Sequence, residues 1–337
     1  MTVDPRLLER IQALTARFTL REGEPTARDA RAFASLFNSV YSRTVTEDYY
    51  LWQFCRSPLG GGCVLAEHEG DLVATYGLRP LKMFAGEECL IGLTVDLMIT
   101  PAARRTGLMS RLEGEIEQRA RGRGCVAIYA TPNAQAYRPR VQRLGWASMG
   151  QVSTYWAETR SHAWRPGRLR IVPVKAFDRA IDGIYRQFVL NHHDLAIVQR
   201  DHAYLNWRYA QNPWYSYDLF VVCEGEAVVG YLVLKLFRDP TSGEAIGDIV
   251  DWLWQRDDAA LLEEVLRFAL FHFAAMGVAR AAAWFETNTL ADRLGGELGF
   301  WPSDQKRYLA CKPLSPRHAW LGDRRRWFLT MGDSEIA

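Results

Sequence analysis

The stretch of sequence that decides the fold is residues 95–109, VDLMITPAARRTGLM. The apolar run from Leu93 to Ile99 predicts a strand that ends before Pro101, and apolar residues four positions apart from Leu108 onward predict a helix directly after it. The turn between them is rich in arginine and closes on Gly107, where the absence of a Cβ lets a ligand approach the backbone. Free amides and the helix dipole make such a turn a cradle for phosphate or pyrophosphate. An ordinary strand-to-helix turn with solvent-facing arginines is the alternative.

The segments on either side of this stretch predict a mixed α/β sheet. Gly62–Arg79 contains two β-rich runs around Glu69-Gly70-Asp71, which is the pattern of a hairpin. After the helix, Cys125–Ala130 predicts a further strand, and a short second helix then precedes Leu144-Gly145-Trp146. The predicted order is helix, antiparallel strands, strand, helix, strand, helix, strand.

The same pattern occurs twice in the chain. An offset of 155 residues, without gaps, aligns Tyr49 with Tyr204, Trp52 with Trp207, Pro58 with Pro213, Glu69 with Glu224, Gly70 with Gly225, Tyr76 with Tyr231, Asp96 with Asp251 and Asn133 with Asn288. Rare residue types on one diagonal indicate a tandem duplication. We expect a first domain over 1–157, a linker over 158–171, a second domain over 172–313 and a tail over 314–337, each domain with a sheet of its own.

Composition narrows the classes of protein that remain. The chain has 337 residues, 48% of them hydrophobic, which is too long for a single small module. It has 41 Lys and Arg against 39 Asp and Glu, and this near-zero net charge argues against a nucleic-acid-binding protein. Six scattered cysteines without a C-x-x-C pair argue against a zinc ribbon or a disulfide scaffold. No apolar stretch approaches the roughly 20 residues of a membrane span, and the charged beginning of the chain predicts a cytoplasmic protein.

Residues 104–109, RRTGLM, resemble the R/Q-x-x-G-x-G/A loop that binds the pyrophosphate of acyl-CoA in the GNAT acyltransferases. Asn133 and Leu144-Gly145-Trp146 resemble that family's asparagine after the next strand and its terminal Gly-Phe/Trp. The resemblance covers nearly the whole chain and implies a tandem GNAT-like protein that uses acetyl-CoA as co-substrate. The cofactor-binding residues that it implies are Met98, Ile99, Arg104, Arg105, Thr106, Gly107, Leu108, Met109 and Asn133.

Asp96 and Tyr137 are the catalytic candidates. Period-two alternation places Thr94, Asp96 and Met98 on one face of their strand, which makes Asp96 the best-placed carboxylate for a general base. Its counterpart Asp251 favours a structural role common to both copies. The family's general-acid tyrosine would fall near Arg140, whereas this chain has Tyr137, which either protonates the leaving thiolate or packs as an aromatic at the sheet edge.

The second copy is not expected to bind CoA. Its segment at the position of the loop, residues 251–260, has no glycine, and the pair Asp257-Asp258 would repel a pyrophosphate. We therefore expect it to supply packing and one wall of the acceptor cleft. His192-His193-Asp194 is interpreted as a polar loop and not as a metal site, and Trp52 and Trp207 as core anchors.

The predicted function is acetyl transfer from acetyl-CoA to the primary amine of a small polar acceptor such as an amino sugar. The predicted partner is thus a small-molecule amine, with no nucleic acid, membrane or metal. Two alternatives stay open: a transferase of the same fold that uses aminoacyl-tRNA, and a catalytically degenerate binding or scaffold protein. Calorimetry with acetyl-CoA separates them.

Overall fold

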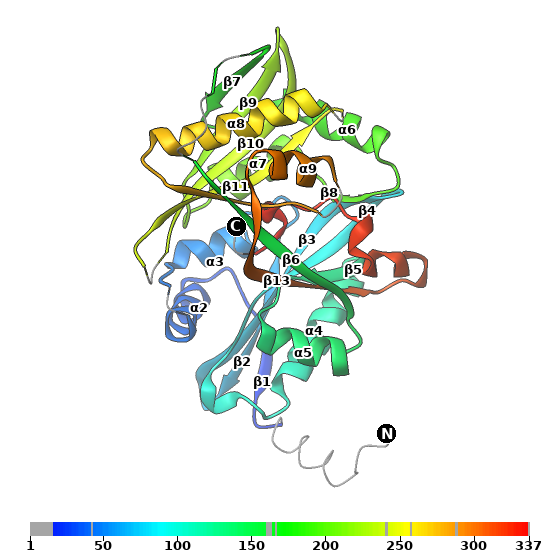
Figure 1. Ribbon diagram of the computed structural model, residues 1–337. Helices are drawn as coiled ribbons and strands as arrows, with labels where there is room; N and C mark the ends of the chain where they lie inside the picture. The colour runs from blue at the N-terminus through cyan, green and yellow to red at the C-terminus, as the bar shows by residue number, and fades with distance from the viewer. Residues whose placement is uncertain are drawn as a thin grey trace.

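The computed structural model describes residues 16–41, 43–159, 164–165, 167–239, 242–256, 258–286 and 289–335. Asp257 and Asn288 lie outside the described residues. The described chain folds into one thirteen-stranded mixed sheet with helices on both faces (Figure 1). The strand order is β1-β2-β3-β4-β5-β13-β6-β12-β11-β10-β9-β7, with β8 paired to β3.

Apart from the additional strands β1, β7 and β8, the elements follow the predicted order in both halves. The first half consists of β1 (Thr19–Glu22), α2 (Ala27–Val40), α3 (Glu47–Phe54), β2 (Gly62–His68), β3 (Asp71–Ala85), β4 (Glu88–Ile99), α4 (Leu108–Gly122), β5 (Cys125–Ala130), α5 (Ala134–Arg143) and β6 (Ala147–Glu158). The second half consists of β7 (Leu169–Val174), α6 (Asp182–Asn191), β8 (Ala196–Val198), α7 (His202–Leu205), β9 (Tyr217–Glu224), β10 (Ala227–Arg238), β11 (Ala245–Trp254), α8 (Ala259–Ala275), β12 (Arg280–Trp284), α9 (Leu290–Glu297) and β13 (Trp301–Pro313). Strand β7 begins inside the segment expected to be a linker.

The expectation of two separate sheets is wrong, because the last strand of each half pairs with the other half. Strand β13 pairs antiparallel with β5, with Ala310 opposite Ala130, and β6 pairs antiparallel with β12, with Ala282 opposite Trp156. The two exchanged strands also pair with each other and cross the middle of the molecule (Figure 1). Each last strand therefore finds its partner in the other half, which joins the two halves into one sheet.

Strands β4 and β5 pair over only part of their length and then separate. Their parallel pairing covers only Leu90–Leu93 against Cys125–Tyr129, whereas β4 continues to Ile99 along the other side of the opening. The register of β4 against β3 shifts at Asp96, whose φ of 52° marks a bulge. The second half repeats the separation, because β11 and β12 pair only over Ile246–Asp248.

The bulge corrects the predicted alternation of side chains on β4. Val95 and Met98 both pack into the core on the side of α2 and α3, and Leu97 packs on the opposite side with α4. Asp96 contacts α3, and Thr94 lies on the other face, where it bonds Tyr76. Asp96 and Met98 therefore share a face, and Thr94 does not, since one extra residue in a strand reverses its period-two pattern.

Candidate active site

The arginine-rich turn after β4 has the geometry of an anion cradle. Helix α4 starts immediately after Gly107, whose φ is 87°, and Arg105 also has a positive φ of 64°. The hydroxyl of Thr106 donates to the carbonyl of Ala103 at 2.8 Å and braces the turn from inside. Within the described chain, the amides of Thr106, Gly107 and Met109 donate no hydrogen bond. These amides are thus available to a phosphate, as at other helix N-termini.

The side chains of the turn divide into core and surface. Leu108 is buried against the sheet, so only its backbone can reach a ligand. Arg104 and Arg105 are exposed, and the Nε of Arg104 donates to the carbonyl of Ile99 at 3.1 Å, which holds its guanidinium over the end of β4. Met109 is half-buried. Backbone amides and exposed cations are the groups that commonly bind a pyrophosphate.

Asn133 and Tyr137 occupy the start of α5. The side chain of Asn133 caps that helix by accepting from the amide of Ala136 at 3.0 Å. Tyr137 shares a hydrogen bond with the hydroxyl of Ser148 on β6, and its ring stacks on Tyr308 of β13 at 4.3 Å between centroids. The structure therefore places Tyr137 against the strands β6 and β13, and no described contact links it to Asp96.

Asp96 is a buried carboxylate without a direct arginine partner. Its oxygens accept from the hydroxyl of Tyr49 at 3.3 Å and from the amide of Gln53 at 3.1 Å, and its exposed fraction is 7%. Desolvation raises the pKa of Asp96 to about 6, and the charge of Arg79 and the two hydrogen bonds partly offset this rise. A carboxylate with this pKa accepts a proton near neutral pH, which suits a general base.

Asp251, the counterpart of Asp96 in the second copy, has a different environment. It forms an ion pair with the buried Arg200 at 3.2 Å and accepts hydrogen bonds from Tyr209 at 2.8 Å and Thr330 at 2.9 Å. A carboxylate fixed by an arginine and two hydroxyls serves structure. The shared sequence position therefore does not require that Asp96 have the same role.

Glu335 is a second carboxylate at the bulge, half-buried, and no sequence pattern pointed to it. Its Oε2 accepts from the backbone amide of Asp96 at 3.2 Å. Desolvation and the nearby charge of Asp96 raise the pKa of Glu335 to about 7, whereas Arg140 and Arg79 act in the opposite direction. No local pattern could have identified it, because the contact joins residues 239 positions apart.

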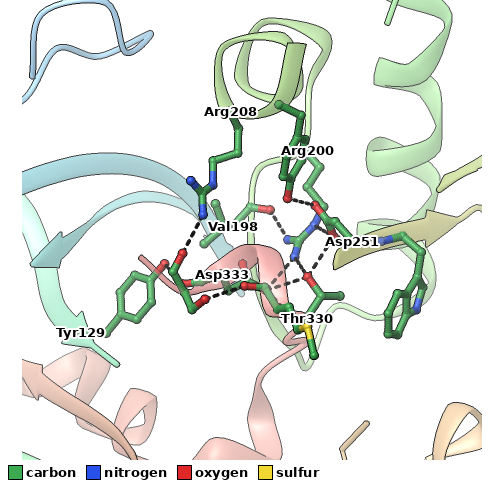
Figure 2. Close-up of polar contacts among 11 residues, drawn as sticks. Tyr129, Val198, Arg200, Arg208, Asp251, Thr330 and Asp333 are labelled. Carbon is green, nitrogen blue, oxygen red and sulfur yellow. Dashed lines mark hydrogen bonds and ion pairs between the residues drawn. The ribbon is translucent and has the colours of Figure 1, made fainter. Parts of the chain in front are cut away.

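A buried network holds the tail that carries Glu335 (Figure 2). Arg200 pairs with Asp333 at 2.7 Å as well as with Asp251, and the hydroxyl of Tyr129 donates to the carbonyl of Asp333 at 3.1 Å. Arg208 then donates to the carbonyl of Ser334 at 2.7 Å. Buried charges paired in this way are costly to break, so the network fixes the tail between the two halves.

The position that corresponds to the cofactor loop in the second copy is built for packing. Trp252 and Trp254 occupy the places of Leu97 and Ile99 and lie parallel, with 6.4 Å between ring centroids. Asp258 caps α8 by accepting from the amide of Leu261, and it pairs with Arg168 and Arg256. This end of α8 already has its anion, which is the side chain of Asp258.

The sequence model of the acetyltransferase (GNAT) family matches residues 30–146, which include the loop, Asp96 and Asn133. The amino-terminal half contains a GNAT-family domain. Within this region, β4, the turn and α4 lie at the position where the sequence resemblance predicts the acyl-CoA loop. Comparison with curated proteins by sequence gives no match.

Solved structures extend the GNAT fold over both halves. A GCN5-related N-acetyltransferase from Anabaena variabilis has a TM-score of 0.66 at 13% identity, over 88% of this chain and 73% of that one. N-myristoyltransferase of Saccharomyces cerevisiae with bound myristoyl-CoA has a TM-score of 0.63 at 13% identity, over 88% and 83%. A fungal glucosamine N-acetyltransferase region within a multi-domain β-N-acetylglucosaminidase has a TM-score of 0.62 at 12% identity, over 87% and 38%.

The described residues lack both metal-ligand clusters and helices that could span a membrane. They contain no group of three or more His, Cys, Asp or Glu side chains that could hold a metal ion, and the loop at His192–Asp194 follows the end of α6. None of their helices combines the length and the apolar character needed to cross a membrane.

Proposed function

We propose that the first half transfers an acyl group from acyl-CoA to a primary amine, and that the acyl group is acetyl. One observation carries the proposal: the separated edge of β4 leads from the Asp96–Glu335 carboxyl pair directly into a turn with free amides. Pantetheine could pair with that edge as an added strand while the pyrophosphate binds the turn. The fold and the family support the coarser activity, acyl-CoA-dependent N-acyl transfer.

The two carboxylates would remove a proton from the amine of the acceptor. Acyl-CoA supplies the activated thioester. An amine is protonated in water, so it must lose a proton before its lone pair can form the new C–N bond. Glu335, with a pKa of about 7, is proposed as the acceptor of that proton, and Asp96 keeps the site negative and orients it. Tyr137, together with Ser148, is the proposed proton donor to the departing thiolate.

A short acyl group fits the surroundings of the bulge. The hydroxyl of Tyr41 donates to the carbonyl of Leu97 at 3.4 Å and that of Tyr49 to Asp96, so two aromatic rings crowd this part of β4. An amino sugar is the proposed acceptor. It is supported by the likeness to the fungal glucosamine N-acetyltransferase region and by the aromatic, hydrogen-bonding side chains of the second half.

The test combines binding and turnover. Calorimetry should show micromolar acetyl-CoA binding at one site per chain, and thiol release should depend on glucosamine. Glu335→Gln should bind acetyl-CoA like the parent and lose most of the turnover. Two equivalent binding sites, or none, would contradict the assignment of the cofactor to the first half. Faster turnover with a long-chain acyl-CoA would contradict acetyl transfer.

A further inference from the structure

A small pocket lies beside the tail that carries Glu335. Met331 and Ser334 of the tail form one side, and Ala282 and Trp284 of β12 form part of its floor. The floor belongs to the same core face as Tyr49 and Trp52, so the pocket and Asp96 lie on one side of the sheet. Its volume of about 100 Å³ is well below the roughly 300 to 1,000 Å³ of a complete ligand site. It therefore has room for one group of a larger molecule.

Two charges of the pocket compensate each other. Lys235 is only 4% exposed, and its ammonium pairs with Asp248 at 3.2 Å and lies 4.4 Å from the ring centre of Tyr215. Desolvation lowers the pKa of Lys235 and raises the pKa of Asp248, as burial does for any charged pair. This pair leaves little net charge to attract a ligand.

Two arginines give the pocket its excess of positive charge. Arg43 and Arg307 both line the pocket, and neither forms an ion pair with a carboxylate of the described chain. Arg43 donates to the hydroxyl of Tyr215 at 2.9 Å, which fixes one side of its guanidinium. Desolvation and the charge of Arg43 lower the pKa of Arg307, an exposed residue, and the charge of Asp248 raises it, so Arg307 lies within reach of both charges. A pair of arginines is stabilised by an anion between its members.

The remaining charged side chain of the lining is Asp239. One oxygen of its carboxylate accepts from the amide and the hydroxyl of Ser242, at 2.8 and 3.1 Å, so it holds the turn after β10. With Asp239 included, the pocket has three cations and two carboxylates, and one positive charge is left over.

We infer that this pocket binds an anionic group, a phosphate or a carboxylate, on the same small molecule whose amine is acylated beside Glu335. The inference rests on the proposed function and narrows the acceptor to an amine that carries a negative charge. Ser334 connects the two places, because it lines the pocket and precedes Glu335 in the chain. Bidentate pairing with a guanidinium is favourable for both phosphate and carboxylate.

The experiment measures binding to protein that is first saturated with CoA, so that the arginine-rich turn is filled. Calorimetry then compares glucosamine 6-phosphate with glucosamine, and β-alanine with β-alaninamide. In one pair or both, the anionic member should bind at least tenfold more tightly. Arg43→Gln and Arg307→Gln should each remove at least fivefold of that preference. Arg186→Gln, an exposed arginine on α6, is the matched control and should change nothing.

Equal affinity within both pairs would overturn the inference, as would a preference that survives both substitutions. The pair that shows the difference identifies phosphate or carboxylate as the group. Failure of CoA to bind in the first step would instead refute the proposed function, since the preference for the anion is measured as binding and not as turnover. Unchanged melting temperatures of the variants would show that their effects do not arise from unfolding.

Discussion

The indole rings of Trp52 and Trp207 form a reciprocal pair at the centre of the molecule. The indole nitrogen of Trp52 donates to the carbonyl of Trp207 at 2.8 Å, and that of Trp207 donates to the carbonyl of Trp52 at 3.0 Å. The rings stack with 5.0 Å between centroids and 17° between planes. Because the two residues are equivalent in the duplication, each copy makes the same contact to the other. Their predicted role as core anchors thus takes a specific form, a joint between the halves.

Trp52→Phe should weaken the protein measurably. The ring is kept, but the carbonyl of Trp207 loses its donor in a buried place, which costs about 1–3 kcal/mol. Trp207→Phe should cost a similar amount, and the double variant should deviate from additivity because the two rings touch. Urea denaturation is the measurement. Trp301→Phe, at a position that is 46% exposed, should stay within about 0.5 kcal/mol.

Gly107→Val should abolish acetyl-CoA binding and leave the fold intact. A β-branched residue at φ of 87° is strained, and its side chain would stand where the pyrophosphate must approach the backbone. Gly277→Val is the matched control, because its φ of 76° imposes similar strain after α8, with open space around the added Cβ. Both variants should lose stability, and only the first should lose calorimetric binding. Normal binding by Gly107→Val would exclude this turn as the cofactor site.

Arg104→Ala and Arg105→Ala should weaken acetyl-CoA binding, and more strongly at low salt. Both guanidiniums are exposed at the cradle, where salt screens their attraction for phosphate. The measurement is the dissociation constant at two or more ionic strengths. If the loss were the same at every salt concentration, the arginines would not contact phosphate.

Asp258→Ala should affect the stability of the protein and not its affinity for acetyl-CoA. Removal of the cap of α8 should lower stability by about 1 kcal/mol, and acetyl-CoA affinity should be unchanged. The thermal melt and the CoA titration of the same sample test both parts. A matching loss of CoA affinity would mean that the cofactor binds the second half.

The rate of acyl transfer should rise as the pH increases through about 7 and then level off. Glu335 must be deprotonated to accept a proton, and its pKa is about 7. Asp96→Asn should move the midpoint to lower pH, because the charge of Asp96 is one cause of the raised pKa. Glu335→Gln should remove this limb of the profile. Glu286→Gln, at another carboxyl whose pKa burial raises, is the control and should leave the midpoint unchanged.

Local sequence patterns predicted the parts of the site that are built locally. Strand β4, the turn and helix α4 lie within the 35 consecutive residues 88–122, so their signals of apolar periodicity, proline and glycine agreed with the structure. The bulge at Asp96 gave no signal, because the extra residue is defined only by the partner strand β3. Glu335 and the exchange of β6 and β13 depend on contacts between distant segments, which periodicity does not report.

The exchange of β6 and β13 bears on how such a protein can evolve. A single copy would leave a gap next to β5, and a second identical copy could fill it as a strand-swapped homodimer. In that dimer every substitution occurs twice, so a lineage could not lose one cofactor loop and keep the other. Fusion into one chain removes this restriction. The second copy could then acquire tryptophans at the end of its strand and a helix cap in place of the loop, while its last strand still completed the sheet of the first half.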